Sequence, residues 1–146
     1  MTVEFAILAP LFLLLVFGIV DFGHAFYLQH LITNACREGA RYGAKYQTNN
    51  LGAHIIPSQL NPSIQNYVLY TSAQNGGKGG WGLSTYLPGD ANPQVTPGGT
   101  GYTSGIAGDD VTVTITARKT WFVLGLLIPT LGSYKNLSVT STMKVE

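Results

Sequence analysis

Two carboxylates lie at places in the sequence where a carboxylate is difficult to keep ionised. Glu4 directly precedes a run of 16 uncharged residues, 5–20, and Asp21 directly follows that run. In apolar surroundings an acidic side chain is costly unless it is paired or protonated, so acids in such a segment are functional candidates by default. The chemistry predicted for these two residues is therefore ion pairing, not catalysis.

The other ionisable residues form no catalytic or metal-binding pattern. The three histidines lack metal-ligand spacing, and no Ser-His-Asp set can be argued from chain order. The acids at 90, 109 and 110 follow no EF-hand pattern, so we interpret them as turn residues. No strand precedes a GxxxxGK[ST] pattern, which excludes a phosphate-binding loop. We predict no enzyme activity, no cofactor and no metal site.

The composition of the chain limits which classes of function remain. The chain has 146 residues, a net charge of +1 and only 10% charged residues, against about 25% in typical soluble domains. This charge suggests neither nucleic acid nor acidic substrates, and the uncharged polar surface is common in exported proteins. Cys36 is the only cysteine, so no intrachain disulfide forms. Asn136-Leu137-Ser138 is a glycosylation acceptor triplet, which makes Asn136 a weak candidate for modification.

The element that positions the two carboxylates is a helix predicted over residues 1–46, about 65–70 Å long. A signal peptide is disfavoured because Glu4 stands where a basic region is expected. An ordinary membrane anchor is disfavoured because of the two acids. We favour a helix that rests in the membrane and later packs among copies of itself. Pro10 predicts a kink or a loosened turn.

Small residues share one face of the end of this helix. They follow Ile32 at helical spacing: Ala35, Cys36, Gly39, Ala40, Gly43 and Ala44. A small face lets another backbone approach closely. Packing on the chain's own domain is the favoured interpretation, and packing on a neighbouring copy is the alternative. Cys36 is predicted to be a packing residue rather than a reactive thiol.

The rest of the chain predicts a small α+β head at 47–146. A short second helix is expected from Asn61-Pro62 to about Ala73, and a long glycine-rich loop over 76–108. Alternating apolar residues predict two antiparallel strands, 111–118 and about 137–145. Between them, the apolar segment 121–131 either folds beneath the strands or meets a neighbour or lipid headgroups. Its candidates for a second assembly surface are Trp121, Phe122, Leu124 and Leu127.

Four stretches of the N-terminal helix form a recognisable set. They are Val3-Glu4-Phe5-Ala6, Pro10 with the leucines after it, Gly18-Ile19-Val20-Asp21-Phe22-Gly23, and Asn34-Ala35-Cys36-Arg37-Glu38-Gly39-Ala40-Arg41. Together they closely resemble the TadE/TadG-like pseudopilins of tight-adherence pili. The Arg-Glu-Gly-Ala-Arg run is the most specific part. The resemblance covers residues 3–46 well and the last strand, with the apolar segment before it, more loosely.

The resemblance implies a type IV pilin-like subunit. A prepilin peptidase cuts a short leader, the helix waits in the inner membrane with the head outside the cytoplasm, and copies then pack into a cell-surface filament, a homopolymer that other pilins join and that serves adhesion. The family's assembly glutamate maps to Glu4. It is usually fifth in the mature chain, after a basic leader that ends in glycine, whereas here it is fourth, so the mature N-terminus stays open.

Residue chemistry agrees with this implication, since the free amine of an adjacent subunit is a ready partner for Glu4. The residues predicted to serve assembly are Glu4, Phe5, Pro10, Asp21, Gly39 and Gly43. Whether the chain is the major subunit of the filament or a minor, tip-capping one remains open. The alternative class is a membrane-anchored extracytoplasmic module that binds a ligand in its glycine-rich loop and does not polymerise. Electron conduction through the helix aromatics is disfavoured because core packing explains those rings.

Overall fold

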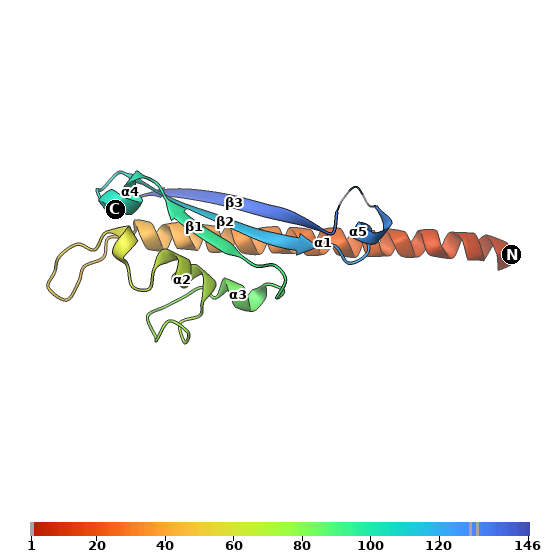
Figure 1. Ribbon diagram of the computed structural model, residues 1–146, viewed down its shortest axis with the longest axis horizontal. Coiled ribbons are helices and arrows are strands. Elements are labelled where there is room, and N and C mark those ends of the chain that lie inside the picture. Colours follow the sequence, from red (N-terminus) through yellow and green to blue (C-terminus); the bar gives the residue numbers. More distant parts are fainter. Residues whose placement is uncertain (1, 129, 131) are drawn as a thin grey trace.

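One helix sets the length of the molecule. The computed structural model describes residues 2–128, 130 and 132–146, with side chains from residue 5 onward except those of 126 and 127. Helix α1 (Thr2–Ala44) runs the length of the head, and its N-terminal part extends beyond it (Figure 1). The predicted helix is confirmed. The helix continues through Pro10, so no break occurs there: proline removes one donor, and the apolar turns on both sides remain helical.

A three-stranded antiparallel sheet lies alongside α1, in the order β1-β2-β3. Its strands are β1 (Gln94–Gly98), β2 (Asp110–Thr120) and β3 (Tyr134–Lys144). The two predicted strands are confirmed as β2 and β3, and their register pairs Ile115 with Val139. The inward side chains of β2 are buried as the alternation predicts: Val111, Val113, Ile115 and Ala117. The fold is therefore α+β, as expected.

The segment 76–108 is more ordered than the long loop predicted for it. It contains α3 (Leu83–Tyr86), strand β1 and α4 (Thr100–Ser104). The prediction missed β1 because Val95 is the only large apolar residue in this strand, and because Pro97 and Gly98 lie within it. Proline is tolerated here since β1 is an edge strand that pairs only with β2.

The second helix, α2 (Ile64–Leu69), is shorter than predicted. It begins after Ser63, whose hydroxyl accepts a hydrogen bond from the Asn66 N–H at 3.2 Å. The capping residue is therefore Ser63, and the predicted cap at Asn61-Pro62 is wrong by two positions. A short 3₁₀ turn, η1 (Pro57–Gln59), precedes this helix, and α5 (Leu124–Leu127) lies between β2 and β3.

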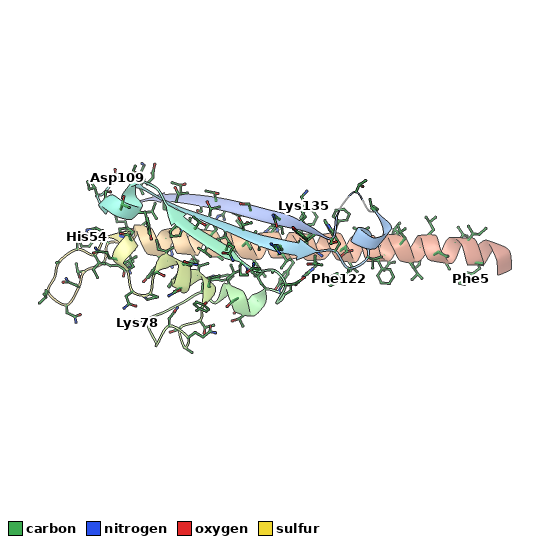
Figure 2. The ribbon with its side chains drawn as sticks, viewed as in Figure 1. Phe5, His54, Lys78, Asp109, Phe122 and Lys135 are labelled. Carbon is green, nitrogen blue, oxygen red and sulfur yellow. The ribbon has the colours of Figure 1, made fainter. Side chains whose placement is uncertain are left out.

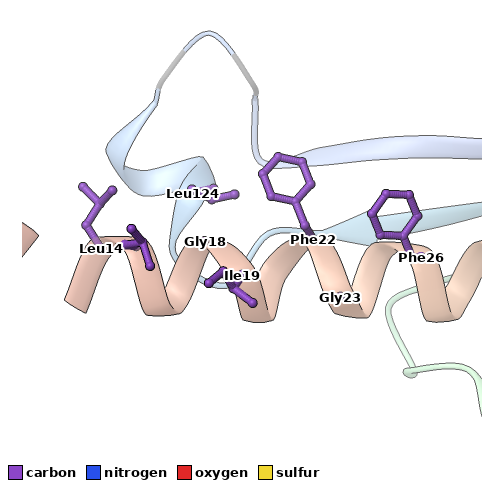
Figure 3. Close-up of a pocket in the computed structure, with 8 residues that line it drawn as sticks. Leu14, Gly18, Ile19, Phe22, Gly23, Phe26 and Leu124 are labelled. Carbon is purple, nitrogen blue, oxygen red and sulfur yellow. The ribbon is translucent and has the colours of Figure 1, made fainter. Parts of the chain in front are cut away.

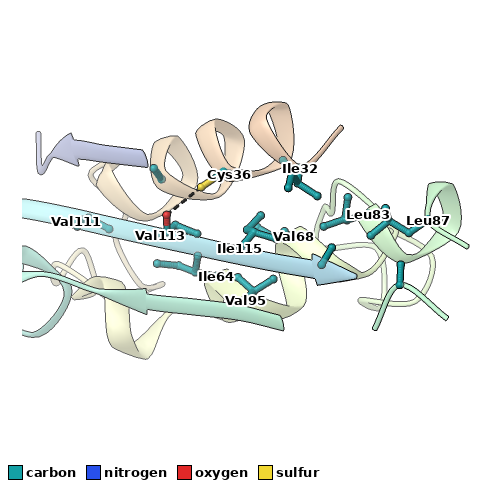
Figure 4. Close-up of a cluster of buried hydrophobic side chains, with 14 of the residues drawn as sticks. Ile32, Cys36, Ile64, Val68, Leu83, Leu87, Val95, Val111, Val113 and Ile115 are labelled. Atoms are coloured by element: carbon teal, nitrogen blue, oxygen red, sulfur yellow. Dashed lines mark hydrogen bonds between the residues drawn. The ribbon is translucent and has the colours of Figure 1, made fainter. Parts of the chain in front are cut away.

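The small face of α1 packs on the chain's own sheet and on α2. Ala35, Cys36 and Ala40 are fully buried there, and the Cys36 thiol donates a hydrogen bond to the Val113 carbonyl at 2.9 Å (Figure 4). A Cβ added at Gly39 would lie 2.6 Å from a Val68 methyl carbon. The interpretation that this face packs within its own domain is confirmed. The C-terminal half of α1 thus forms one wall of the head's core.

We predict that Gly39→Leu destabilises the head, whereas Gly23→Leu does not. The added side chain at Gly39 must displace Val68 and Val113, and overpacking of this kind costs about 1–3 kcal/mol. A Cβ at Gly23, on the same helix, meets nothing within 4 Å. Thermal unfolding of both variants in detergent measures the difference, and equal melting temperatures would contradict the close packing at Gly39.

Candidate functional site

The N-terminal part of α1 is apolar and largely uncovered. Every large apolar side chain from residue 11 to 15 is exposed: Leu11, Phe12, Leu13, Leu14 and Leu15. Five consecutive residues cover all faces of a helix, so the exposure is not a one-sided stripe. Within the described residues, α1 is the one helix long and apolar enough to cross a membrane.

Asp21 lies at the end of this uncovered part and is fully buried. The strap (residues 121–128, which follows β2 and includes α5) crosses α1 at this level and covers the carboxylate. The side chain accepts hydrogen bonds from three consecutive strap amides, the N–H groups of Phe122 at 2.9 Å and of Val123 and Leu124 at 3.0 Å each. One carboxylate therefore satisfies three backbone donors that no sheet or helix partner takes.

Lys119 provides the opposite charge. Its ammonium nitrogen lies 3.4 Å from an Asp21 carboxylate oxygen, and both side chains are fully buried. It also donates to the Thr120 carbonyl and lies over two strap rings, 5.1 Å from the ring centre of Trp121 and 4.6 Å from that of Phe122. We call Asp21, Lys119 and the three strap amides the Asp21 clamp. A buried carboxylate here is thus paired and hydrogen-bonded, as desolvation requires.

The rest of the strap is partly buried against α1. Leu124 is only 6% exposed and covers Gly18, beside an apolar hollow of about 590 Å³ along the helix (Figure 3). Phe122 and Ile128, by contrast, are 66% and 43% exposed. The predicted alternative of complete burial beneath the strands is therefore wrong, because part of the strap stays exposed. The other alternative, contact with a neighbour or with lipid headgroups, stays a prediction.

Aromatic contacts fix the strap to the helix on two sides. Trp121 meets the Phe22 ring edge-on, with ring centres 6.0 Å apart. The ring centres of Phe122 and His24 lie 5.2 Å apart. In the described part of the chain, two buried side-chain nitrogens have no hydrogen-bond partner, Nδ1 of His24 and Nε1 of Trp121. Both belong to this contact. Buried unpaired polar atoms are rare, so their occurrence here marks the contact as distinct from an ordinary core.

The predicted site residues fall into separate groups. Asp21 and the strap residues are brought together by the clamp, whereas Gly39 and Gly43 lie in the head's core. Phe5 and Pro10 are exposed on α1, and Glu4 is in the same helix. The side chains of Glu4 and Leu127 lie outside the described residues. Their roles in assembly stay predictions.

Sequence reasoning missed Lys119. The signal was present, because the alternation that places Val111 and Ala117 inward on β2 also places residue 119 inward, as observed. A lysine at an inward position requires an acid, and Asp21 was the unpaired acid. Among the described residues, no group of three or more His, Cys, Asp or Glu side chains could bind a metal ion.

Comparison with protein families finds a similarity in the N-terminal helix. The family model described as TadE-like protein matches residues 1–41. These residues are similar to that family. The match lies almost wholly within α1, includes Asp21 and the small face, and confirms the resemblance over this segment. Comparisons with curated proteins and with solved structures give no match. The TadE-like segment and its apolar helix together indicate a membrane protein related to Tad pili.

We predict that Asp21→Asn loosens the strap. The amide keeps one acceptor oxygen but leaves the Lys119 charge buried and unpaired, and breaking a buried pair costs about 3–5 kcal/mol. Amide hydrogen exchange should then accelerate at Phe122, Val123 and Leu124. The matched control is Glu38→Gln, which removes a half-exposed carboxylate of α1 that pairs with Arg41. If both variants exchange alike at the strap, the clamp does not fix it.

Proposed function

We propose that the chain is a structural subunit of a Tad-like, type IV pilin-like extracellular filament, in which copies pack through α1. The observation that carries this proposal is the exposed apolar half of α1 within the TadE-like segment. Burying a single large apolar side chain is worth about 1.5–3 kcal/mol, and this half carries more than ten exposed ones, so it requires apolar surroundings. The membrane supplies these surroundings before assembly and neighbouring helices supply them afterwards.

The proposed organisation divides the chain at residue 46 into a filament-core helix and a head, 47–146. The C-terminal half of α1 also belongs to the head's core, so a head fixed rigidly to α1 follows the helix into the filament. Asp21, Gly39 and Gly43 then serve assembly by holding the head at one position on α1. We further propose that the head lies outside the cytoplasm, that a prepilin peptidase processes the chain, and that its role is not enzymatic.

Glu4 is the proposed charge partner for assembly. It precedes the uncharged run and lies 17 residues before Asp21, which on a helix is about 25 Å from the clamp and from Lys119. It therefore needs a cation from elsewhere, and the N-terminal amine of a neighbouring copy is one that a helical array brings into the apolar core. Phe5 and Pro10 belong to the surface that would pack around this pair.

The strap is the proposed second assembly surface. Phe122 is exposed and Trp121 lies beside it, while Leu124 is already used to cover Gly18. In a filament, the exposed part would contact a neighbour's helix or head. Asn136, exposed on β3, is accessible as the proposed glycosylation site.

We predict that Glu4→Ala abolishes most filaments without removing the chain from the membrane. The uncharged run is unchanged, so membrane partition is kept, whereas the pair that orders neighbouring helices is lost. Electron microscopy of sheared cell-surface material measures filament yield, and membrane fractionation measures retention.

The control is Glu38→Gln, which alters a half-exposed carboxylate of the same helix and should leave filament yield unchanged. Normal yield from Glu4→Ala would refute the pairing. A wild-type chain that stays in the membrane and never occurs as a repeating unit would instead favour the anchored binding module.

A further inference from the structure

We propose that the strap lies in the interface of a phospholipid bilayer, with Phe122 and Ile128 in contact with lipid, and that it sets the depth at which α1 enters the membrane. This inference rests on the membrane stage of the proposed function and concerns a surface other than the filament-core helix. The partner is the headgroup and upper acyl-chain region of the bilayer.

The first argument is length. The uncharged run, 5–20, has 16 residues and is about 24 Å long, which is shorter than the roughly 30 Å hydrocarbon core of a bilayer. Exposed large apolar side chains continue beyond Asp21, at Phe22 and Phe26. From Phe5 to Phe26 the helix has 22 residues and is about 33 Å long, which matches the core. A membrane that covers this whole length reaches the strap, because the strap crosses α1 at Gly18 and Asp21.

The second argument is that the charged side chains at this level already neutralise each other. Asp21 and Lys119 are fully buried and paired with each other, and the three strap amides donate to Asp21. An unpaired carboxylate would keep lipid away from this level of the helix. With the Asp21 clamp formed, the exposed large apolar side chains at this level include Phe22, Phe122 and Ile128.

The third argument is the rim around the strap. The adjoining ends of β2 and β3 carry two exposed cations, Arg118 and Lys135, of which Lys135 is labelled in Figure 2. The Arg118 guanidinium lies 5.0 Å from the ring centre of Tyr134. Asp90, an acid at the same end, accepts a hydrogen bond from Thr120. Aromatic rings and long cationic side chains directly above an apolar band are the composition of a membrane interface, where the cations reach lipid phosphates.

The fourth argument favours lipid over a protein partner at this stage. The exposed apolar residues 11–15 occupy every face of α1, and a single docked protein would cover only one side. A bilayer covers all sides at once. The aromatic side chains of the strap adjoin this surface, because Phe22 contacts Trp121. Lipid that surrounds the helix therefore extends to the strap.

The test uses the two tryptophans of the chain, Trp81 and Trp121. The full-length chain is reconstituted in phosphatidylcholine vesicles containing lipids brominated either near the headgroup or deep in the acyl chain. Trp81→Phe leaves Trp121 as the reporter, and Trp121→Phe leaves Trp81, which lies just before α3 in the head. We expect the shallow bromines to quench Trp121 at least about threefold more than Trp81, and more than the deep bromines do. Equal quenching of the two tryptophans, or stronger quenching of Trp121 by the deep bromines, would overturn the proposal.

A surface substitution provides the second measurement. In the Trp81→Phe background, Phe122→Ser should raise quenching of Trp121 by aqueous iodide about twofold, because a lipid-facing ring is lost. Ile106→Ser is the control, since Ile106 is also exposed, at 62%, but lies near α4 at the opposite end of the head. If circular dichroism shows that Phe122→Ser fails to fold, Ile128→Ser is used instead. Iodide quenching that changes with neither strap variant would contradict lipid contact.

Vesicle quenching and filament yield separate this inference from the proposed function. A strap in the interface of a chain that never forms filaments refutes only the filament. Filaments formed by a chain whose strap is fully accessible to iodide refute only the interfacial strap.

Discussion

The pairing of Asp21 with Lys119 and the strap amides is the interaction on which the position of the head along α1 depends. It joins residue 21 of the helix to residues 119–124 of the chain, and both charged side chains are fully buried. A buried pair is weak support for stability, because desolvation offsets much of the attraction. What it provides is specificity. A shift of α1 by one residue would turn Asp21 away and leave one buried cation and three amides unpaired, so only one register of helix against strap is tolerated.

This constraint divides α1 into two parts with different surroundings. C-terminal to the clamp, the helix presents small residues to the sheet, and Gly43 approaches so closely that an added Cβ would lie 2.5 Å from the end of Ile64. N-terminal to the clamp, most large apolar side chains are exposed. One end of the same continuous helix therefore belongs to the core of the head, and the other end is an exposed apolar helix. Asp21 lies at the boundary between the two.

Most of the fold could be predicted from the sequence because its signals are local. The uncharged run and the small face give α1, and strict alternation gives β2 and β3. Strand β1 could not be predicted, since Val95 alone carries its apolar pattern and its pairing with β2 is non-local. At the site, Asp21 was recognised as an acid that needs a partner, but Lys119 was not matched to it. That match depends on the strap returning across α1, and 98 residues separate the two partners.

The burial of Gly39 and Gly43 changes where the contacts of an assembly must be sought. Because these residues pack against Val68 and Val111 of their own chain, a substitution there disturbs the head whether or not a neighbour is present. Loss of filaments in such a variant cannot then be assigned to a lost contact between copies. Surfaces that stay exposed in the folded chain do not have this ambiguity. Two of them are the apolar half of α1 and the outer side of the strap at Phe122. Both lie on the N-terminal side of the core, so copies that associate through them can pack with their heads unchanged.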